Sequence, residues 1–475
     1  MSPLFPSLYA ADPREAIRFG EHTLTHAELA AAAAPPARRI ADAGRVAVWA
    51  TPTPQTVIGV VAALVAGVPV VPLNPKTGER ELTHIVRDSG PTAVLAGAGD
   101  QLPPALAELT RIDVSTDAGT YPAPGPGLPP EPDDESAAFV IYTSGTTGPP
   151  KGAVLPRRAV AATLDALRDA WDWTADDVLV HGLPLFHVHG LILGILGPLR
   201  RGGSVRHLGR FSVEGVTREL STGATMLFGV PTMYHRIAEV VYGDRELAKA
   251  LTGARLLVSG SAALPAPDHR RIAQATGRAV IERYGMTETL MLCGERADGE
   301  ARPGTVGGPL PGVELRLADE ADGIGEIQVR GPSLFSGYLN RPDATAAAFT
   351  EDGWFRTGDM ASLDADGQVR IVGRKATDLI KSGGYKIGAG EIENALLDHP
   401  GVREAAVTGE PDDDLGERIV AWVVPADPQL PPDPDELMNH VADQLAPHKR
   451  PRVVHYLPEL PRNDMGKIMK RALHV

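Results

Sequence analysis

Short apolar runs alternate with amphipathic helical patterns along the first three hundred residues. Residues 45–50, 92–96 and 138–142 are runs suited to buried parallel strands, and a helix is expected from Thr25, its N-cap, to about residue 32. Further strands are expected at 178–181, 226–229, 255–259 and 280–284. Strands alternating with helices predict a doubly wound α/β sheet, in which a ligand lies at the carboxyl ends of the strands.

The pattern changes near residue 312. Residues 325–331 and 368–373 read as antiparallel strands. Beyond them, helices are expected at 391–397 and 436–445, and strands at 404–408 and 419–424. We therefore predict an α/β protein with a large N-terminal domain, 1–373, made of doubly wound sheets plus a small β-barrel-like portion. A smaller, mobile α+β domain, 374–475, follows it. The Pro- and acid-rich segment 121–135 is expected to be a surface linker.

Composition narrows the classes of function. The chain has 475 residues, 43% hydrophobic and 22% charged, which excludes disorder, collagen and coiled coil for the chain as a whole. The formal net charge of −14 disfavours a nucleic-acid partner. The most apolar stretch, 57–73, is interrupted by glycine and proline and is expected to be a buried helix and strand, not a membrane span. No obligate protein partner is evident.

The single cysteine, Cys293, can form neither an internal disulfide nor a cysteine metal cage. Residues 1–14 lack the basic start and apolar core of a signal peptide. We expect a cytoplasmic protein.

The strongest local signal is the sequence YTSGTTGPPKG at 142–152, which follows a strand. Its glycines let the backbone wrap a phosphate, its hydroxyls donate hydrogen bonds, and Lys151 adds positive charge. It is not a Walker loop, because the glycine spacing differs and Lys151 is followed by Gly152.

This loop resembles the phosphate loop of the adenylate-forming superfamily, which includes acyl-CoA synthetases, luciferases and peptide-synthetase adenylation domains. Further motifs of that superfamily follow in the same order: PLFHVHG at 184–190, GSA at 260–262, YGMTE at 284–288, TGD at 357–359, GR at 373–374, SGGY at 382–385 and NDMGK at 463–467.

The resemblance implies an enzyme that uses ATP and Mg²⁺ to make an acyl-adenylate and then passes the acyl group to coenzyme A. Lys467 is then the adenylation lysine, Glu288 and Thr143 hold Mg²⁺, and His187 gates the acyl site. ATP would be bound by Thr143, Ser144, Gly145, Thr146, Thr147, Gly148, Lys151, Gly260, Ser261, Ala262, Tyr284, Gly285, Thr287, Asp359 and Arg374. Coenzyme A would meet Ser382, Gly383, Gly384 and Tyr385 after the C-terminal domain rotates.

Two arginines bear on the substrate. Arg283 lies on the strand before the YGMTE loop, and Arg236 lies where the superfamily builds its acyl pocket. A buried arginine needs an anion, and guanidinium binds carboxylate in a bidentate fashion. Here the sequence is similar to bacterial malonyl-CoA synthetases, which implies malonate or methylmalonate as substrate, with Val188 and Met286 flanking its C2 atom. An ordinary salt bridge is the alternative for each arginine.

Several readings stay open. The hinge GRKATD is about one residue longer than usual, so the pivot is one of Lys375, Ala376 and Thr377. His189 is either a core histidine or part of the site, and the basic residues Arg206, His207 and Arg210 are either a site for the phosphates of coenzyme A or a solvated loop. Rival functions are a ligase for another short acid, a ligase that loads an acid onto a carrier protein, a nucleotide-binding regulator without catalysis, and a luciferase.

Overall fold

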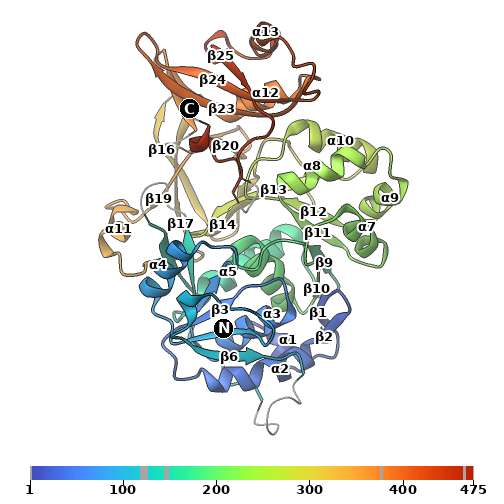
Figure 1. Cartoon of the computed structure of the whole chain (residues 1–475), viewed down its shortest axis with the longest axis vertical. Helices are drawn as coiled ribbons and strands as arrows, with labels where there is room; N and C mark the ends of the chain where they lie inside the picture. Colours follow the sequence, from blue (N-terminus) through green and yellow to red (C-terminus); the bar gives the residue numbers. More distant parts are fainter. Residues whose placement is uncertain are drawn as a thin grey trace.

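The computed structural model describes residues 3–117, 127–143, 149–321, 323–374, 378–383, 385–463 and 467–473. Figure 1 shows the C-terminal segment, orange to red, at one end of the long axis and the blue N-terminal segment toward the other. Two mostly parallel sheets make up the larger part, which confirms the α/β class.

The first sheet has seven strands in the order β18-β8-β7-β4-β3-β5-β6. Its bounds are β3 (Val46–Trp49), β4 (Val70–Leu73), β5 (Ala93–Gly97), β6 (Thr110–Val114), β7 (Ala137–Thr143), β8 (Lys151–Pro156) and β18 (Gly337–Tyr338). The strands expected at 45–50, 92–96 and 138–142 are all present. The first two pairings in this order, β18 with β8 and β8 with β7, are antiparallel, and the others are parallel.

The second sheet has nine strands in the order β15-β14-β13-β12-β11-β9-β10-β1-β2. Its bounds are β1 (Glu15–Phe19), β2 (His22–Thr25), β9 (Val178–His181), β10 (Ser204–His207), β11 (Met226–Gly229), β12 (Leu256–Ser259), β13 (Val280–Met286), β14 (Leu290–Gly294) and β15 (Gly308–Pro309). The strands from β1 through β10, β9, β11 and β12 to β13 run parallel, so β11, β12 and β13 end at one edge.

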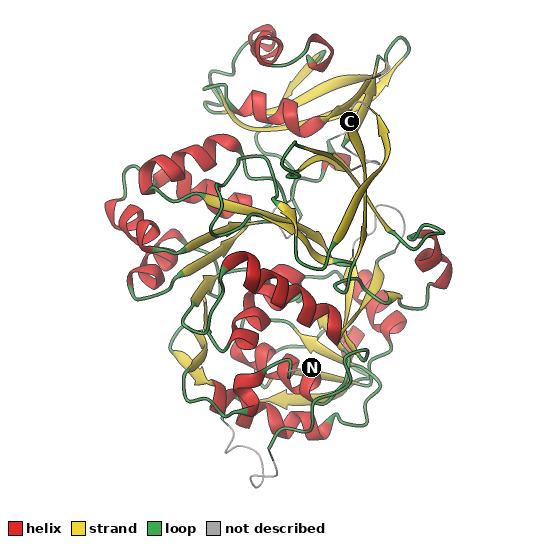
Figure 2. Cartoon of the chain, turned by 180° about the vertical axis from the view of Figure 1, so that it is seen from behind, coloured by secondary structure: helices red, strands yellow, loops and turns green. Residues whose placement is uncertain are grey.

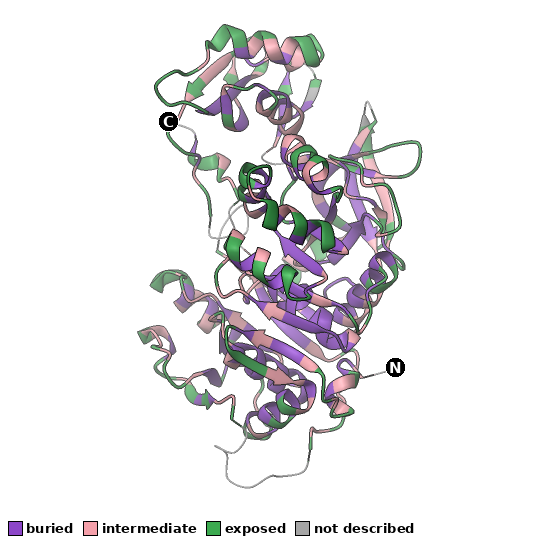
Figure 3. Ribbon diagram, turned by 90° about the vertical axis from the view of Figure 1, so that its right-hand side faces the viewer, coloured by how far each residue is buried: buried purple, intermediate pink, exposed green. Residues whose placement is uncertain are grey.

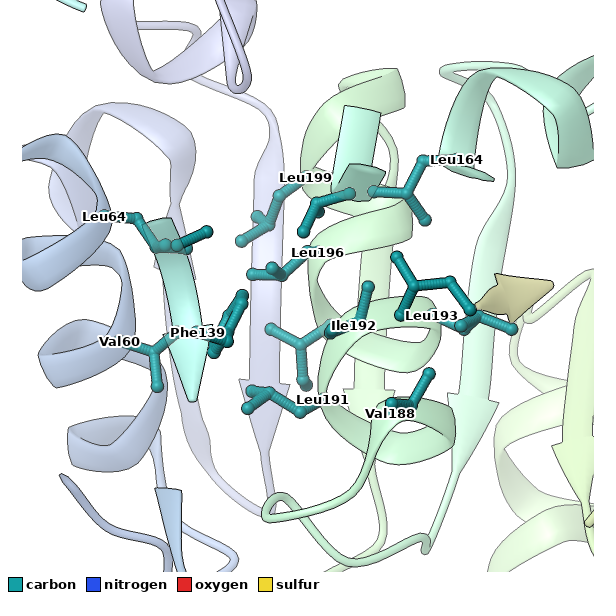
Figure 4. Packing of buried hydrophobic residues seen from close by; sticks show 14 of the residues in the cluster. Val60, Leu64, Phe139, Leu164, Val188, Leu191, Ile192, Leu193, Leu196 and Leu199 are labelled. Atoms are coloured by element: carbon teal, nitrogen blue, oxygen red, sulfur yellow. The ribbon is translucent and has the colours of Figure 1, made fainter. Parts of the chain in front are cut away.

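The main core contains helices that pack between or beside these sheets. They are α1 (Pro6–Tyr9), α2 (His26–Arg39), α3 (Pro54–Val65), α5 (Arg157–Trp171), a π-helix, η3 (His189–Leu196), and α6 (Gly197–Arg201). All residues of α3 except Gln55 are buried, as expected of an apolar helix that is covered on all sides. In Figure 4, Val60 of α3 and Leu191 and Ile192 of η3 lie on opposite sides of Phe139 on β7.

The remaining helices cover outer faces. Helix α4 (Glu79–Ser89) and the short η1 (Pro104–Leu106) pack on the first sheet. The outer face of the second sheet is covered by α7 (Val213–Ser221), α8 (Pro231–Val240), α9 (Arg245–Gly253) and α10 (Ala266–Thr276). Figure 2 shows these helices, in red, beside the yellow strands, and Figure 3 shows the buried strands between exposed helix faces. Thr25 caps α2 with a capping box, in which its side chain accepts from the backbone N–H of Glu28.

The portion expected to resemble a β-barrel is a four-stranded antiparallel sheet in the order β16-β17-β19-β20. It consists of β16 (Glu314–Ala321), β17 (Ile324–Arg330), β19 (Phe355–Leu363) and β20 (Val369–Arg374), with α11 (Pro342–Ala347) between β18 and β19. Its last strand ends at Arg374, which pairs in register with Asp359.

The C-terminal segment has its own sheet and core. The sheet runs β22-β21-β24-β23, and β25 pairs with β24. Its elements are β21 (Leu379–Ser382), β22 (Tyr385–Gly388), α12 (Ala389–Leu397), β23 (Val402–Asp412), β24 (Gly416–Pro425), α13 (Pro434–Gln444), η4 (Pro447–Lys449), β25 (Val453–Tyr456) and η5 (Lys470–Ala472). An apolar cluster joins α12 and α13 to this sheet. The division between residues 373 and 374 stays a prediction.

Part of the expected linker, 121–126, lies outside the described residues. In its described part, Glu131 accepts a hydrogen bond from the backbone N–H of Leu4 and pairs with the buried guanidinium of Arg157. This segment is therefore tied to the core and is more than a surface connection. None of the helices in the described ranges has the length and apolar character needed to cross a membrane.

Candidate active site

The phosphate-loop motif connects two adjacent strands. Thr143 ends β7 and Lys151 begins β8, and the two residues pair across the antiparallel ladder. Ser144, Gly145, Thr146, Thr147 and Gly148 lie outside the described residues. Lys151 extends its ammonium group over the ring of Tyr338, with Nζ 5.0 Å from the ring centroid. This cation–π contact fixes the lysine beside the loop.

Tyr338 also joins Lys151 to Glu288. Its hydroxyl donates to Oε1 of Glu288 over 2.8 Å, and the backbone N–H of Phe335 donates to the carbonyl of Glu288 over 2.8 Å. Glu288 is buried at 6% exposure. The carboxylate of Glu288 and the hydroxyl of Thr143 are hard oxygen donors, which suit Mg²⁺. The described residues contain no cluster of three or more His, Cys, Asp or Glu side chains, so much of the coordination would come from phosphate and water.

The motifs predicted to bind ribose meet at Asp359. The hydroxyl of Tyr284 donates to Oδ2 of Asp359 over 2.6 Å, and Nε of Arg374 lies 2.8 Å from Oδ1. Burial raises the pKa of Asp359, while Arg374, Tyr284 and the charge of Lys467 each favour the ionised form. Both carboxylate oxygens are thus held in place at the end of the four-stranded sheet.

Lys467 lies in a hairpin at the end of the chain. The backbone N–H of Asn463 donates to the carbonyl of Lys467 over 2.9 Å, and the backbone N–H of Lys467 donates to Oδ1 of Asn463 over 3.0 Å. Since the charge of Lys467 acts on Asp359, this hairpin lies toward the predicted nucleotide site. The TGD motif at Asp359 and the C-terminal motif at Lys467, more than a hundred residues apart in the sequence, are thus brought toward each other.

Arg283 is buried at 5% exposure, and its Nε and Nη2 have no hydrogen-bond partner among the described residues. Burial lowers its pKa to about 10, so the guanidinium stays charged at neutral pH. The alternative of an ordinary salt bridge for Arg283 is therefore not found within the described ranges. An unpaired buried guanidinium is costly, and an anionic ligand would supply the missing acceptor.

Other unpaired polar atoms accompany Arg283. The hydroxyl of Ser259 and both ring nitrogens of His189 are buried without a partner among the described residues. Burial and the nearby charge of Arg283 lower the pKa of His189, which keeps its imidazole neutral. Gly260 makes room for the guanidinium, because a Cβ atom there would lie 2.3 Å from Cζ of Arg283. His189 is thus a buried, neutral histidine close to Arg283, and its part in the site stays a prediction.

The other predicted acyl-site residues differ in exposure. Val188 is buried at 8% exposure, while His187 and Met286 are half-buried, and His187 packs on Phe186 at 4.7 Å between ring centroids. Arg236 is exposed on α8, so its contact with a substrate stays a prediction. In the GSA motif, Ser261 and Ala262 are exposed, and in the YGMTE motif, Gly285 and Thr287 are half-buried.

The loop predicted to meet coenzyme A connects β21 and β22. Ser382 is buried, Gly383 has a left-handed φ of 58°, and Tyr385 is half exposed and stacks on His448 at 4.1 Å. Gly384 lies outside the described residues.

Of the three basic residues considered for the phosphates of coenzyme A, Arg210 is exposed, and the other two are paired or buried. Arg206 pairs with Glu15 and Glu219, and His207 is buried, with its pKa lowered to about 4 by desolvation.

Sequence reasoning missed Tyr338. It lies on β18, a strand of two residues that pairs with β8 at Ala153 and Val154, and nothing in its local sequence marks it as functional. The only available signal was an aromatic residue in a Gly-rich segment after the expected antiparallel strand.

Comparisons with known proteins agree with this geometry. A family model described as AMP-binding enzyme matches residues 9–339, and one described as AMP-binding enzyme C-terminal domain matches residues 391–467. A malonate–CoA ligase from Arabidopsis thaliana is 36% identical over 90% of this chain and 77% of its own length.

Two solved structures are also similar. A malonyl-CoA ligase in a ternary product complex with methylmalonyl-CoA and AMP is 71% identical over 96% of this chain and all of that chain, with a TM-score of 0.75. ATP-bound MatB from Rhodopseudomonas palustris is 34% identical over all of this chain and 98% of that chain, with a TM-score of 0.91.

Proposed function

The chain belongs to the AMP-binding enzyme family, and we propose that it joins malonate, and also methylmalonate, to coenzyme A at the expense of ATP. The observation that carries the choice of acid is Arg283, a buried guanidinium without a partner among the described residues. A second carboxylate on the acyl substrate supplies that partner. The reaction releases AMP and pyrophosphate.

In the first step, a carboxylate oxygen of malonate attacks the α-phosphorus of ATP, the P–O bond to pyrophosphate breaks, and malonyl-adenylate forms. Two anions must approach each other, so positioning and charge neutralisation are the main contributions of the protein. Lys467 bridges the carboxylate and the α-phosphate, and Lys151 and the loop from Thr143 bind the other phosphates. Asp359 and Arg374 hold the ribose.

Glu288 and Thr143 would hold Mg²⁺, which supplies charge neutralisation at the phosphates. The hydrogen bond from Tyr338 fixes Glu288 for this role. Since the tyrosine also contacts Lys151, one side chain orients both the metal ligand and the phosphate-binding cation.

The distal carboxylate of malonate lies against Arg283, with Ser259 and neutral His189 as further hydrogen-bonding groups. Val188 and Met286 flank C2, where methylmalonate carries its extra methyl group. We keep Arg236 as a weaker contact, because it is exposed.

In the second step, the sulfur of coenzyme A attacks the carbonyl carbon of the adenylate, the thiol proton is lost, and AMP leaves. We propose that residues 374–475 form a mobile domain that rotates to bring Ser382, Gly383, Gly384 and Tyr385 to this reaction, with His187 gating the thiol's approach. The TM-scores support this proposal. The malonyl-CoA ligase product complex is 71% identical and has a TM-score of 0.75, whereas ATP-bound MatB is only 34% identical and has a TM-score of 0.91. The arrangement here is therefore closer to that of the ATP-bound relative.

We propose the cytoplasm as the location. The only cysteine, Cys293, is buried, and burial raises the pKa of its thiol, so it is inert and needs no oxidising compartment. The partners proposed are the small molecules ATP, malonate, methylmalonate and coenzyme A.

Thioester formation across a panel of acids tests the proposal. Malonate and methylmalonate should be used far better than acetate, butyrate or octanoate, with AMP and pyrophosphate released in equal amounts. Sulfoacetate, which carries a sulfonate as its second anion, tests whether the pocket reads charge alone or carboxylate geometry. Preference for a monocarboxylate would overturn the substrate assignment, and failure to release pyrophosphate with any acid would overturn the reaction.

A further inference from the structure

Lys470 lies between two carboxylates in the C-terminal segment. Its Nζ is 2.7 Å from Oε1 of Glu393 on α12 and 3.3 Å from Oδ1 of Asp378, and its side chain is only 16% exposed. Burial works against the charged form, but Glu393 and Asp378 outweigh it and raise the pKa of the ammonium group. Lys470 is therefore a largely buried, charged lysine that pairs with both Glu393 and Asp378.

Asp378 connects this cation to the strand that ends at Arg374. Its Oδ2 accepts a hydrogen bond from the backbone N–H of Arg374 over 3.1 Å, and its own backbone N–H donates to the carbonyl of Arg374 over 2.9 Å. These two bonds span the segment 375–377, in which the pivot is expected. They join Arg374, the last residue of the four-stranded sheet, to Asp378, the residue directly before β21.

Arg374 continues the connection to the nucleotide site, because its Nε lies 2.8 Å from Oδ1 of Asp359. At the other end, Lys470 comes three residues after Lys467. The hairpin that carries Lys467 is held by the bonds of Asn463 with Lys467 and by the backbone N–H of Met469, which donates to the carbonyl of Pro461 over 2.8 Å. A continuous set of polar contacts thus runs from Asp359 through Asp378 to the base of the Lys467 hairpin.

We propose that Lys470 is a positioning residue for adenylation: its ion pairs with Asp378 and Glu393 hold the Lys467 hairpin against the hinge in the arrangement that places Lys467 at the nucleotide. This inference rests on the proposed function. Any rotation about residues 375–377 changes the path between Arg374 and Asp378, so the bonds that Asp378 makes to Arg374 belong to the present arrangement. Lys470 stabilises that arrangement by holding the Asp378 carboxylate in the accepting position.

Removing the ammonium group leaves Asp378 and Glu393 facing each other without a counter-charge, and like charges repel. Asp378 would then turn toward water, and the bond to Arg374 would weaken. Among the described residues, the contacts of this group do not include Ser382, Gly383 or Tyr385, which belong to the loop where the second step is proposed. The two half-reactions should therefore respond differently.

The test measures the half-reactions of the full-length enzyme separately. Malonate-dependent exchange of pyrophosphate into ATP reports adenylation, and CoA-dependent consumption of supplied malonyl-adenylate reports thioester formation. Lys470→Met should lower the adenylation kcat by about 10- to 100-fold, with the KM for ATP changed by less than about threefold. Thioester formation should stay within about threefold of wild type. Lys470→Arg, which keeps the charge, should restore most of the adenylation rate.

Two further variants keep the test decisive. Lys249→Met makes the same substitution at an exposed lysine of α9 and should leave both half-reactions near wild type. Asp378→Asn keeps an oxygen for the Arg374 N–H but loses the ion pair with Lys470, and should reproduce part of the adenylation defect even if Lys470→Met folds poorly.

Equal losses in both half-reactions for Lys470→Met and Asp378→Asn, or no loss in either, would overturn the positioning role. Failure of the wild-type enzyme itself to exchange pyrophosphate with malonate would instead overturn the proposed function, so the two outcomes are distinguishable.

Discussion

Arg283 occupies the volume that a side chain at position 260 would need, since a Cβ atom on Gly260 would lie 2.3 Å from Cζ of the guanidinium and 2.5 Å from Nε. Gly260 follows the end of β12 and Arg283 lies in the middle of β13, and these two strands pair in parallel. The glycine of the GSA motif, predicted to form the adenine turn, is therefore also needed to accommodate the Arg283 guanidinium.

Gly260→Ala should displace the Arg283 guanidinium and lower kcat/KM for malonate by about 10- to 100-fold, since overpacking a tight site costs about 1–3 kcal/mol. Steady-state thioester assays with malonate and butyrate measure the effect. Gly253→Ala is the matched control, because a Cβ atom there meets nothing within 4 Å. A Gly260 variant as active and as selective as wild type would show that Arg283 has room to move.

Arg283→Met should lower kcat/KM for malonate by about 10²- to 10³-fold, because leaving one partner of a buried charge pair alone costs about 3–5 kcal/mol. Butyrate lacks the second charge and should lose little. The ratio between the two acids is informative because a folding defect lowers both together. Arg236→Ala, at an exposed position, should cost about fivefold or less. A parallel fall for malonate and butyrate in Arg283→Met would make this arginine structural.

Lys467→Ala should lose malonate-dependent pyrophosphate release by several orders of magnitude and keep much of its ability to convert supplied malonyl-adenylate to thioester. Gly384→Trp should show the reverse, because a bulky side chain blocks the path of the pantetheine arm. Rapid-quench measurement of both half-reactions in both variants tests this. If each variant lost both steps equally, the proposal that Lys467 serves adenylation and the loop at Gly384 serves thioester formation would be refuted.

Asp359→Ala should raise the KM for ATP by about 10- to 100-fold, since hydrogen bonds to a charged group contribute about 1.5–3 kcal/mol each. Tyr284→Phe removes only the 2.6 Å bond to Asp359 and should have a smaller effect of the same kind. Initial rates over a range of ATP concentrations measure both. Unchanged ATP kinetics in the Asp359 variant would show that the ribose binds elsewhere.

Glu282 predicts a pH dependence of stability. It precedes Arg283 on β13, is 3% exposed, and burial raises its pKa to about 8; neighbouring Glu295 adds to the shift. Between the ordinary value of 4.5 and about 8 the folded protein holds a proton that the unfolded chain has lost, so stability falls as pH rises through this window. Glu295, whose pKa is also raised, contributes in the same direction.

Glu282→Gln should therefore flatten the fall in Tm between pH 5 and pH 8.5 by several degrees, with stability close to wild type at the acid end. Differential scanning calorimetry across that range measures it. Glu300→Gln, an exposed glutamate of the loop that follows Glu295, should leave the slope unchanged. Identical slopes for wild type and Glu282→Gln would contradict the assignment.

The strands could be predicted because their signal is local. The expected strand at 178–181 and the strand at 226–229 coincide with β9 and β11, and both are continuous apolar runs of buried parallel sheet. The motifs are also short and linear, so they could be recognised locally, while the role of their residues at a nucleotide stays a prediction. Asp359, Tyr284 and Arg374 are found in contact.

What could not be predicted depends on contacts between distant segments. The opposite exposures of Arg283 and Arg236 follow from the strand and helix faces they occupy, which their flanking sequences do not reveal. Tyr338 joins Lys151 to Glu288 only because a two-residue strand pairs with β8. Lys470 reads locally as one more basic residue near the end of the chain, and its partners lie on a helix and at the hinge.

The pairing of β1 with β10 has a consequence for synthesis of the protein in the cell. Ser204 and Glu15, at the starts of these strands, are hydrogen-bonded although they are 189 residues apart. At about 5–20 residues per second, a ribosome needs roughly 10–40 s to deliver β10 after β1 has been made. During that time Ile17 and Phe19 lack the neighbours that β10 provides, Val205 and His207. Slowing translation between these strands lengthens the exposure, so yield in a host cell should depend on codon choice and on chaperone supply over this part of the message.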